Sequence, residues 1–208
     1  MIGSSESIDA WTEALAAPTP TPAGGSAAAI AAALGAALVG MVAGLTTGRE
    51  SYAENQAQVI AALARAEPLR QRLLALATED GEVYHDVLTA LALPRRTEEE
   101  IARRNAARAT ALKDAASVQY ELLLLAGETA DLSETMVAGG LRSAVGDAAT
   151  ATFLATAACR SAYWAIRANL RRIHDDPTAE RMLQQALERL ELVEATEARV
   201  RLLLAERL

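Results

Sequence analysis

The strongest constraint on the fold is the segment from Ala27 to Thr47, whose 21 residues include no charge. It is long enough to cross a bilayer, and Gly40 and Gly44 form a GxxxG pair that lets helices approach closely. An all-round apolar helix can also lie buried in a soluble bundle. Nine of the 21 residues are alanine, which is only weakly apolar, and no aromatic belt flanks the segment. The segment therefore favours a buried central helix over a membrane span.

The rest of the chain has the pattern of amphipathic helices. Apolar residues make up 51% of the sequence but aromatic residues only 3%, so alanine, leucine and valine must form the core, which suits closely packed helices. Helices are predicted over residues 5–16, 27–47, 51–91 with a kink or a new start at Pro68, 97 to beyond 125, 143–172 and 176–208. The sequence thus predicts an all-α, up-and-down bundle of about six helices, as one domain over residues 1–208.

Several helix ends carry chemical signals. Ser26 follows a Gly-rich turn and is a candidate N-cap. Thr97 and Glu100 have the spacing of a capping box. Gly139-Gly140 predicts a break, and Asp176 before Pro177 predicts the start of the last helix.

Charge and cysteine content narrow the partners and the compartment. The formal net charge of −7 argues against nucleic acid, because phosphate binding requires a basic surface. The single cysteine, Cys159, cannot form an internal disulfide and fits a reducing compartment. The first eleven residues lack the cationic start and apolar core of a signal peptide. We therefore expect a cytoplasmic protein without a nucleic-acid or membrane partner.

Two aspartates are candidates for catalysis. Asp80 shares one helical stripe with Tyr84, Val87 and Leu91, and a carboxylate on such an apolar stripe is costly to bury unless it is paired or used. The alternative is a carboxylate at the edge of the core that binds an arginine. Asp147 follows a glycine break near a helix start, where it could simply stabilise the helix dipole.

Two short patterns are candidate ligand sites. Glu82 and His85 form an E-x-x-H match, but di-iron bundles need two copies, and the other histidine, His174, does not supply one. We therefore expect no metal. Gly24-Gly25-Ser26 before a helix could offer backbone N–H groups to an anion, or could be a tight turn that lets two helices pack.

The segments taken together resemble the formiminotetrahydrofolate cyclodeaminase/methenyltetrahydrofolate cyclohydrolase family. The likeness extends from about residue 8 to about residue 175 and depends on the order and spacing of its motifs. The segments that carry it are Pro20-Thr-Pro-Ala-Gly-Gly-Ser26, Leu45-Thr-Thr-Gly-Arg49-Glu-Ser-Tyr52, Asp80-Gly-Glu-Val-Tyr84, Ala92-Leu-Pro-Arg95 with Thr97-Glu-Glu, Gly146-Asp147 and Asn169-Leu170.

The resemblance implies an all-α homodimer that acts on a folate without a metal or redox cofactor. One family reaction closes 5-formiminotetrahydrofolate to 5,10-methenyltetrahydrofolate with loss of ammonia, and the other hydrolyses the methenyl compound to 10-formyltetrahydrofolate. A carboxylate can stabilise the cationic carbon and take a proton from the nucleophile. Asp80 is the first candidate for this role and Asp147 the second. The residues expected to bind the substrate are Gly24, Gly25, Ser26, Arg49, Tyr84, Arg104 and Asn169. Of these, the two arginines are expected to bind the carboxylates of the folate's glutamate tail.

The chain also departs from the family pattern. A common proline is replaced by Gln119, and the other departures are Ala23, Leu141, Gly146 and Ala165. Losing amide side chains removes hydrogen-bonding groups that could hold a pterin. The changes around Gly140 and Ala165 favour the alternative of a catalytically silent helical dimer that binds a folate-like ligand or a protein partner.

Overall fold

The computed structural model describes residues 6–173 and 176–208, and every regular element in them is helical. This confirms the all-α prediction. In chain order the elements are α1 (Ile8–Ala16), α2 (Gly24–Thr46), η1 (Glu50–Asn55), α3 (Gln56–Ala92), α4 (Glu98–Gly139), η2 (Arg142–Ala144), α5 (Val145–Leu170) and α6 (Pro177–Arg207).

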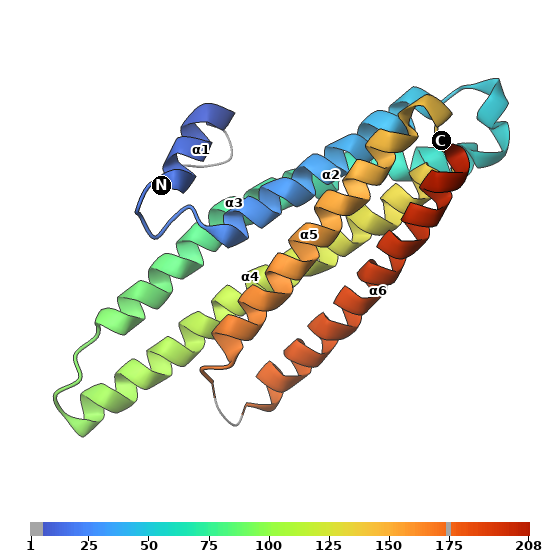
Figure 1. Ribbon diagram of the computed structural model, residues 1–208. Helices are drawn as coiled ribbons and strands as arrows, with labels where there is room; N and C mark the ends of the chain where they lie inside the picture. The colour runs from blue at the N-terminus through green and yellow to red at the C-terminus, as the bar shows by residue number, and fades with distance from the viewer. Residues whose placement is uncertain (1–5, 174–175) are drawn as a thin grey trace.

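The five long helices run up and down along an elongated bundle (Figure 1). Helices α3 and α4 are the longest and extend as a hairpin beyond the start of α2. The short α1 lies beside the first half of α2 and buries none of its own residues. Helices α2 and α5 run antiparallel. One end of the bundle therefore holds the start of α2 and the end of α5, and the other end holds the end of α2 and the start of α5.

Helix α2 packs against α3, α4 and α5, as expected for a central helix. It has the length and hydropathy of a membrane span, but half of its most apolar 18-residue window is buried inside the bundle. Small residues allow the close packing: a Cβ on Gly35 would lie 3.0 Å from the carbonyl oxygen of Ala151 on α5. The remaining residues of this window of α2 are exposed or half-buried.

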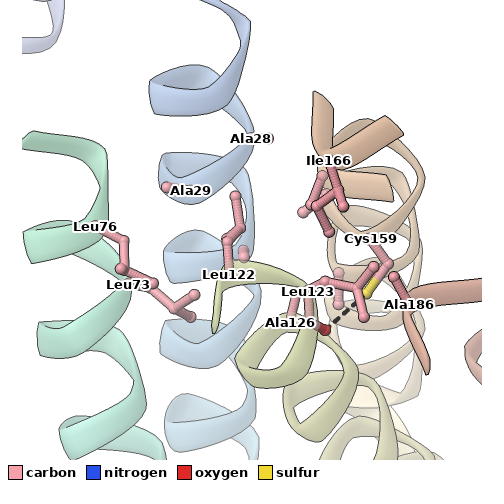
Figure 2. Packing of buried hydrophobic residues seen from close by; sticks show 14 of the residues in the cluster. Ala28, Ala29, Leu73, Leu76, Leu122, Leu123, Ala126, Cys159, Ile166 and Ala186 are labelled. Atoms are coloured by element: carbon pink, nitrogen blue, oxygen red, sulfur yellow. Dashed lines mark hydrogen bonds between the residues drawn. The ribbon is translucent and has the colours of Figure 1, made fainter. Parts of the chain in front are cut away.

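Alanine and leucine fill the main core, as the composition predicts. Figure 2 shows Leu73 and Leu76 of α3 beside Ala28 and Ala29 of α2, with Leu122 of α4 next to them. Large side chains from one helix face small side chains from the next, so the backbones approach closely without leaving voids. These contacts fix the positions of α2, α3 and α4 relative to one another along the bundle axis.

Three predicted helix ends are confirmed. Thr97 accepts a hydrogen bond from the backbone of Glu100, whose side chain in turn accepts one from the backbone of Thr97. The last residue of α4 is Gly139, and Asp176 caps α6 through Thr178 and Ala179.

Other predicted ends differ from the structure. Ser26 is not an N-cap, because α2 begins at Gly24 with Ala23 as its cap and Ser26 already lies inside the helix. Pro68 does not begin a new helix, since α3 continues through it. The helix predicted from Ser51 starts as the 3-10 helix η1. Of the first predicted helix, Ser5 lies outside the described residues, and α1 begins at Ile8 after the cap Ser7.

Candidate functional site

Asp80 is held by two uncharged donors from neighbouring helices. Ser26 on α2 donates from Oγ to Asp80 Oδ2 at 2.9 Å. Gln119 on α4 donates from Nε2 to Asp80 Oδ1 at 2.6 Å. Ser26 and Gln119 are only 1% and 2% exposed, so the carboxylate is anchored to the core on both oxygens. This answers the choice left open by the sequence: the partners of Asp80 in the described chain are neutral, and no arginine pairs with it.

The neighbouring carboxylates, by contrast, share an arginine. Arg72 on α3 binds Glu79, and its Nε lies 2.6 Å from Glu121 Oε1 on α4. The hydrogen bond from Arg72 lowers the pKa of Glu121, and the two carboxylates raise the pKa of Arg72. Neither Glu79 nor Glu121 lines the crevice described below, so the carboxylate that a ligand there would meet is that of Asp80.

Gly25 lets α2 approach this pair of side chains. A Cβ at residue 25 would lie 2.2 Å from Gln119 Nε2 and 2.3 Å from Asp80 Oδ1, far inside van der Waals contact. A Cβ on the neighbouring Gly24 would meet nothing within 4 Å. Of the two interpretations of the Gly-rich turn, the structure supports close packing: Gly25 leaves the space that the Ser26–Asp80–Gln119 hydrogen bonds occupy.

Asp80 forms part of the wall of a crevice of about 210 Å³ at the end of the bundle where α2 starts. Tyr84 on α3 and Asn169 on α5 contribute polar atoms to the same wall. The remaining lining residues are mostly small or apolar: Thr21, Ala23, Gly25, Val83, Ala115, Gln119, Ala165 and Ala168. A carboxylate in a crevice with apolar walls can attract a cationic ligand that has a flat, apolar body.

A larger hollow of about 420 Å³ lies near the opposite end, between α3, α4 and α6. Its one carboxylate, Glu134, is bound by Arg199 at 2.6 Å. Volume alone would select this larger hollow, whereas the chemistry of the carboxylate selects the crevice beside Asp80. The smaller crevice is the better candidate, because its carboxylate has no cationic partner in the described chain.

The predicted site residues fall into two groups, one at the end of the bundle that holds the crevice and one at the opposite end. Gly25, Asp80, Tyr84 and Asn169 line the crevice, and Ser26 lies behind Asp80. Gly24 is exposed and does not line the crevice, so the structure gives no support to its predicted contact with the substrate. Arg104 lies on the α3–α4 hairpin, where its guanidinium donates to the carbonyl of Leu91 at 3.2 and 3.1 Å.

Asp147 and Arg49 lie at the other end of the bundle. Asp147 is exposed in the first turn of α5, and the rise of a helix puts it about 33 Å from Asn169 at the far end. Arg49 follows α2 and donates to the carbonyl of Leu45 at 2.7 Å. Within one chain these two residues lie at the opposite end of the bundle from the crevice beside Asp80. Their predicted roles would require a second chain.

Three of the departures from the family pattern occur in the crevice. Ala23, Gln119 and Ala165 line it, whereas Leu141 and Gly146 lie beside η2 at the other end. The sequence identifies Gln119 only as a departure and gives no indication of its contact with Asp80. The available signal is its place in the repeat of Leu112, Ala115, Ala116 and Leu122, where an uncharged polar residue interrupts an apolar helical face.

The described residues contain no group of three or more His, Cys, Asp or Glu side chains placed to hold a metal ion. Glu82 and His85, the E-x-x-H pair, are both exposed on α3. His174 lies outside the described residues.

Comparisons with known proteins agree on one family. The sequence model of the formiminotransferase-cyclodeaminase family matches residues 7–188. Methenyltetrahydrofolate cyclohydrolase of Methylorubrum extorquens is 37% identical over 180 residues, which cover 86% of each chain. The crystal structure of formiminotetrahydrofolate cyclodeaminase from Thermotoga maritima has a TM-score of 0.80 and 25% identity, covering 98% of this chain and 96% of that one.

Proposed function

The chain belongs to the formiminotransferase-cyclodeaminase family, and from this premise we propose that it hydrolyses methenyltetrahydrofolate in the crevice beside Asp80. The observation that carries the proposal is the state of Asp80, a carboxylate anchored by two neutral donors and facing a crevice with largely apolar walls. No cationic side chain of the described chain pairs with this carboxylate. The substrate's amidinium carbon is cationic, so the two charges are complementary.

The first step is attack by water on the amidinium carbon. A C–O bond forms, and the attacking water loses a proton to Asp80, which acts as general base. The negative carboxylate also stabilises the cation before the attack. Ser26 and Gln119 hold the carboxylate in one orientation, so it need not reorganise as the proton arrives.

The second step opens the ring. The C–N5 bond breaks, its electron pair returns to N5, and the oxygen on the carbon becomes a carbonyl as its remaining proton leaves to water. Asp80 returns its proton to N5, giving 10-formyltetrahydrofolate and a regenerated carboxylate. These steps transfer protons but no electrons, so we propose that no redox cofactor takes part and that a metal is not needed.

A second candidate reaction uses the same geometry. The Thermotoga maritima relative is a formiminotetrahydrofolate cyclodeaminase, and its fold covers nearly all of this chain. In that reaction N10 attacks the formimino carbon in place of water, and ammonia leaves. Binding without turnover is the third candidate, favoured by Ala165, which lines the crevice but offers it no side-chain hydrogen-bonding group.

The test is turnover followed at the methenyl absorbance band. We expect the band to fall when the protein is added to methenyltetrahydrofolate, faster than in buffer alone. Cyclodeamination would instead make the band rise from 5-formiminotetrahydrofolate, with release of ammonia. If the protein binds either folate in calorimetry yet changes neither rate, the enzymatic proposal is wrong and the binding role is favoured.

We further propose that the protein is a homodimer that covers the outer face of α2. This face has no charge, and Leu34, Met41 and Leu45 on it are 53%, 41% and 44% exposed. Ile60 and Leu63 of α3 continue it, at 53% and 38%. Such a continuous apolar surface is costly to leave in water, and a second copy presents an equally uncharged surface to it.

The dimer predicts a clear effect of charge on α2. Leu34→Glu combined with Met41→Glu should convert the protein to a monomer, because burying two carboxylates on an apolar face is unfavourable. Leu202→Glu is the matched control, since Leu202 on α6 is 69% exposed and far more open to water. Light scattering during size exclusion gives the mass directly. A monomeric wild type, or a dimer that survives both glutamates, would contradict the proposal.

A cytoplasmic location is also proposed. Cys159 is buried in the core, and burial raises the pKa of its thiol to about 12. The thiol therefore stays protonated and out of reach, and the chain does not depend on an oxidising compartment for stability.

A further inference from the structure

Gln119 has a buried side-chain amide whose nitrogen forms a hydrogen bond and whose oxygen forms none within the described chain. It is 2% exposed on α4 and lines the crevice. Its Nε2 donates to Asp80 Oδ1 at 2.6 Å, while its Oε1 has no hydrogen-bond partner in the described chain. An ionised carboxylate can only accept hydrogen bonds, so the NH₂ side of the amide must face Asp80 while Asp80 is charged. Oε1 is then left over.

The unpaired oxygen has a consequence when Asp80 gains a proton. A carboxylic acid carries an O–H donor and would face the NH₂ group of Gln119, donor against donor. Turning the amide over by a half rotation places Oε1 against the new O–H. Because Oε1 has no partner to lose, this rotation breaks no other hydrogen bond on the far side. Gly25 leaves the space beside the amide free of a side chain.

We propose that Gln119 is a positioning residue that holds Asp80 in both of its protonation states. Nε2 donates to the carboxylate before the proton is taken, and Oε1 accepts from the carboxylic acid after the amide turns over. Ser26 can serve both states as well, since its hydroxyl either donates or accepts. This inference rests on the proposed hydrolysis, in which Asp80 takes a proton from water and returns it to N5.

The proton count is unchanged by the rotation. The proton moves from the attacking water to Asp80 and from Asp80 to N5, and Gln119 neither gains nor loses one. Its contribution is to keep the carboxyl group at the same distance from the reacting carbon throughout the cycle. Catalytic rates are sensitive to such positioning, because a displacement of about 1 Å can cost about 10²-fold.

The first test replaces Gln119 with methionine, which keeps the length and removes both hydrogen-bonding groups. We expect Gln119→Met to lower kcat by about 10²-fold with KM close to the wild-type value, because Asp80 loses one of its two anchors but the crevice keeps its walls. Ser117→Ala is the matched control on the same helix, as Ser117 is exposed and bonds only to the carbonyl of Lys113. It should leave both constants unchanged.

The second test is Gln119→Glu, which replaces the amide by a carboxyl group of the same shape. Two carboxyl groups this close share a single proton over the pH range between their two titration steps, and the introduced carboxyl, while it holds that proton, can donate to Asp80 as the amide does. At higher pH the shared proton is lost and the two charges repel. We therefore expect kcat to fall with rising pH over a range in which the wild-type value is constant.

The outcomes separate the two proposals. A wild-type kcat in Gln119→Met, or a Gln119→Glu profile with the wild-type shape, would overturn the positioning role while leaving the hydrolysis intact. A wild-type protein without turnover would remove the hydrolysis itself. If Gln119→Met loses its helical circular dichroism, the pH profile of Gln119→Glu decides alone.

Discussion

Asp80→Asn should lower kcat for methenyltetrahydrofolate by about 10²–10⁴-fold, the range that a general base contributes. The asparagine keeps the size of the side chain and can still accept from Ser26, but it cannot take a proton from water. It also lacks the negative charge that attracts the cationic carbon, so KM should rise as well. Initial rates at the methenyl band, measured over a range of substrate concentrations, give both constants.

Asp86→Asn is the control for this substitution. Asp86 lies on the same helix, is exposed and does not line the crevice, so its amide should leave kcat and KM unchanged. Full turnover by Asp80→Asn would show that the reaction takes place elsewhere, and Asp147 would then become the first candidate.

Gly25→Ala should nearly abolish activity, although it adds a single methyl group. The new Cβ would lie 2.2 and 2.3 Å from polar atoms of Gln119 and Asp80, so at least one of these side chains must leave its position. Overpacking of this kind costs about 1–3 kcal/mol of stability, and the displaced carboxylate should cost about 10²-fold in kcat. Thermal unfolding and steady-state rates measure the two effects separately.

The adjacent glycine gives an unusually close control. A Cβ on Gly24 meets nothing within 4 Å, and the residue lies in the first turn of α2. Gly24→Ala should therefore keep full activity, with stability equal to the wild type or higher by about 0.5–1 kcal/mol, since alanine loses less entropy than glycine in a helix. Equal activity in the two variants would show that Asp80 and Gln119 yield to the methyl group without loss of function.

The sequence predicts those parts of the fold that have a local chemical cause. Thr97 with Glu100 and Asp176 with Pro177 mark helix starts because their hydrogen bonds form within one turn. Pro68 illustrates the limit: a proline predicts a helix boundary or a kink, yet α3 stays continuous because Leu69 and the residues of the following turns pack into the core. Tertiary contacts decide such cases, and they are not visible in a local window.

The same distinction applies to the site. Asp80 and Tyr84 share a stripe on one helix, so the sequence pattern places them together correctly. Ser26, Asp80 and Gln119 come from three helices, and their separations of 54 and 39 residues leave no periodic trace. The sequence predicts Ser26 as a helix cap, but it binds Asp80 instead, because α2 starts two residues earlier. Which donors reach a carboxylate is a property of the packed bundle.

The neutral anchoring of Asp80 bears on how the proposed cycle ends. Had an arginine paired with this carboxylate, the crevice would have little preference between charged and uncharged folates. With serine and glutamine as its only protein partners in the described chain, Asp80 attracts the cationic end of the substrate and gains nothing comparable from the formyl product, whose reacting end carries no positive charge. The reaction thus removes the positive charge that holds the substrate beside Asp80, and 10-formyltetrahydrofolate should be a weak competitive inhibitor.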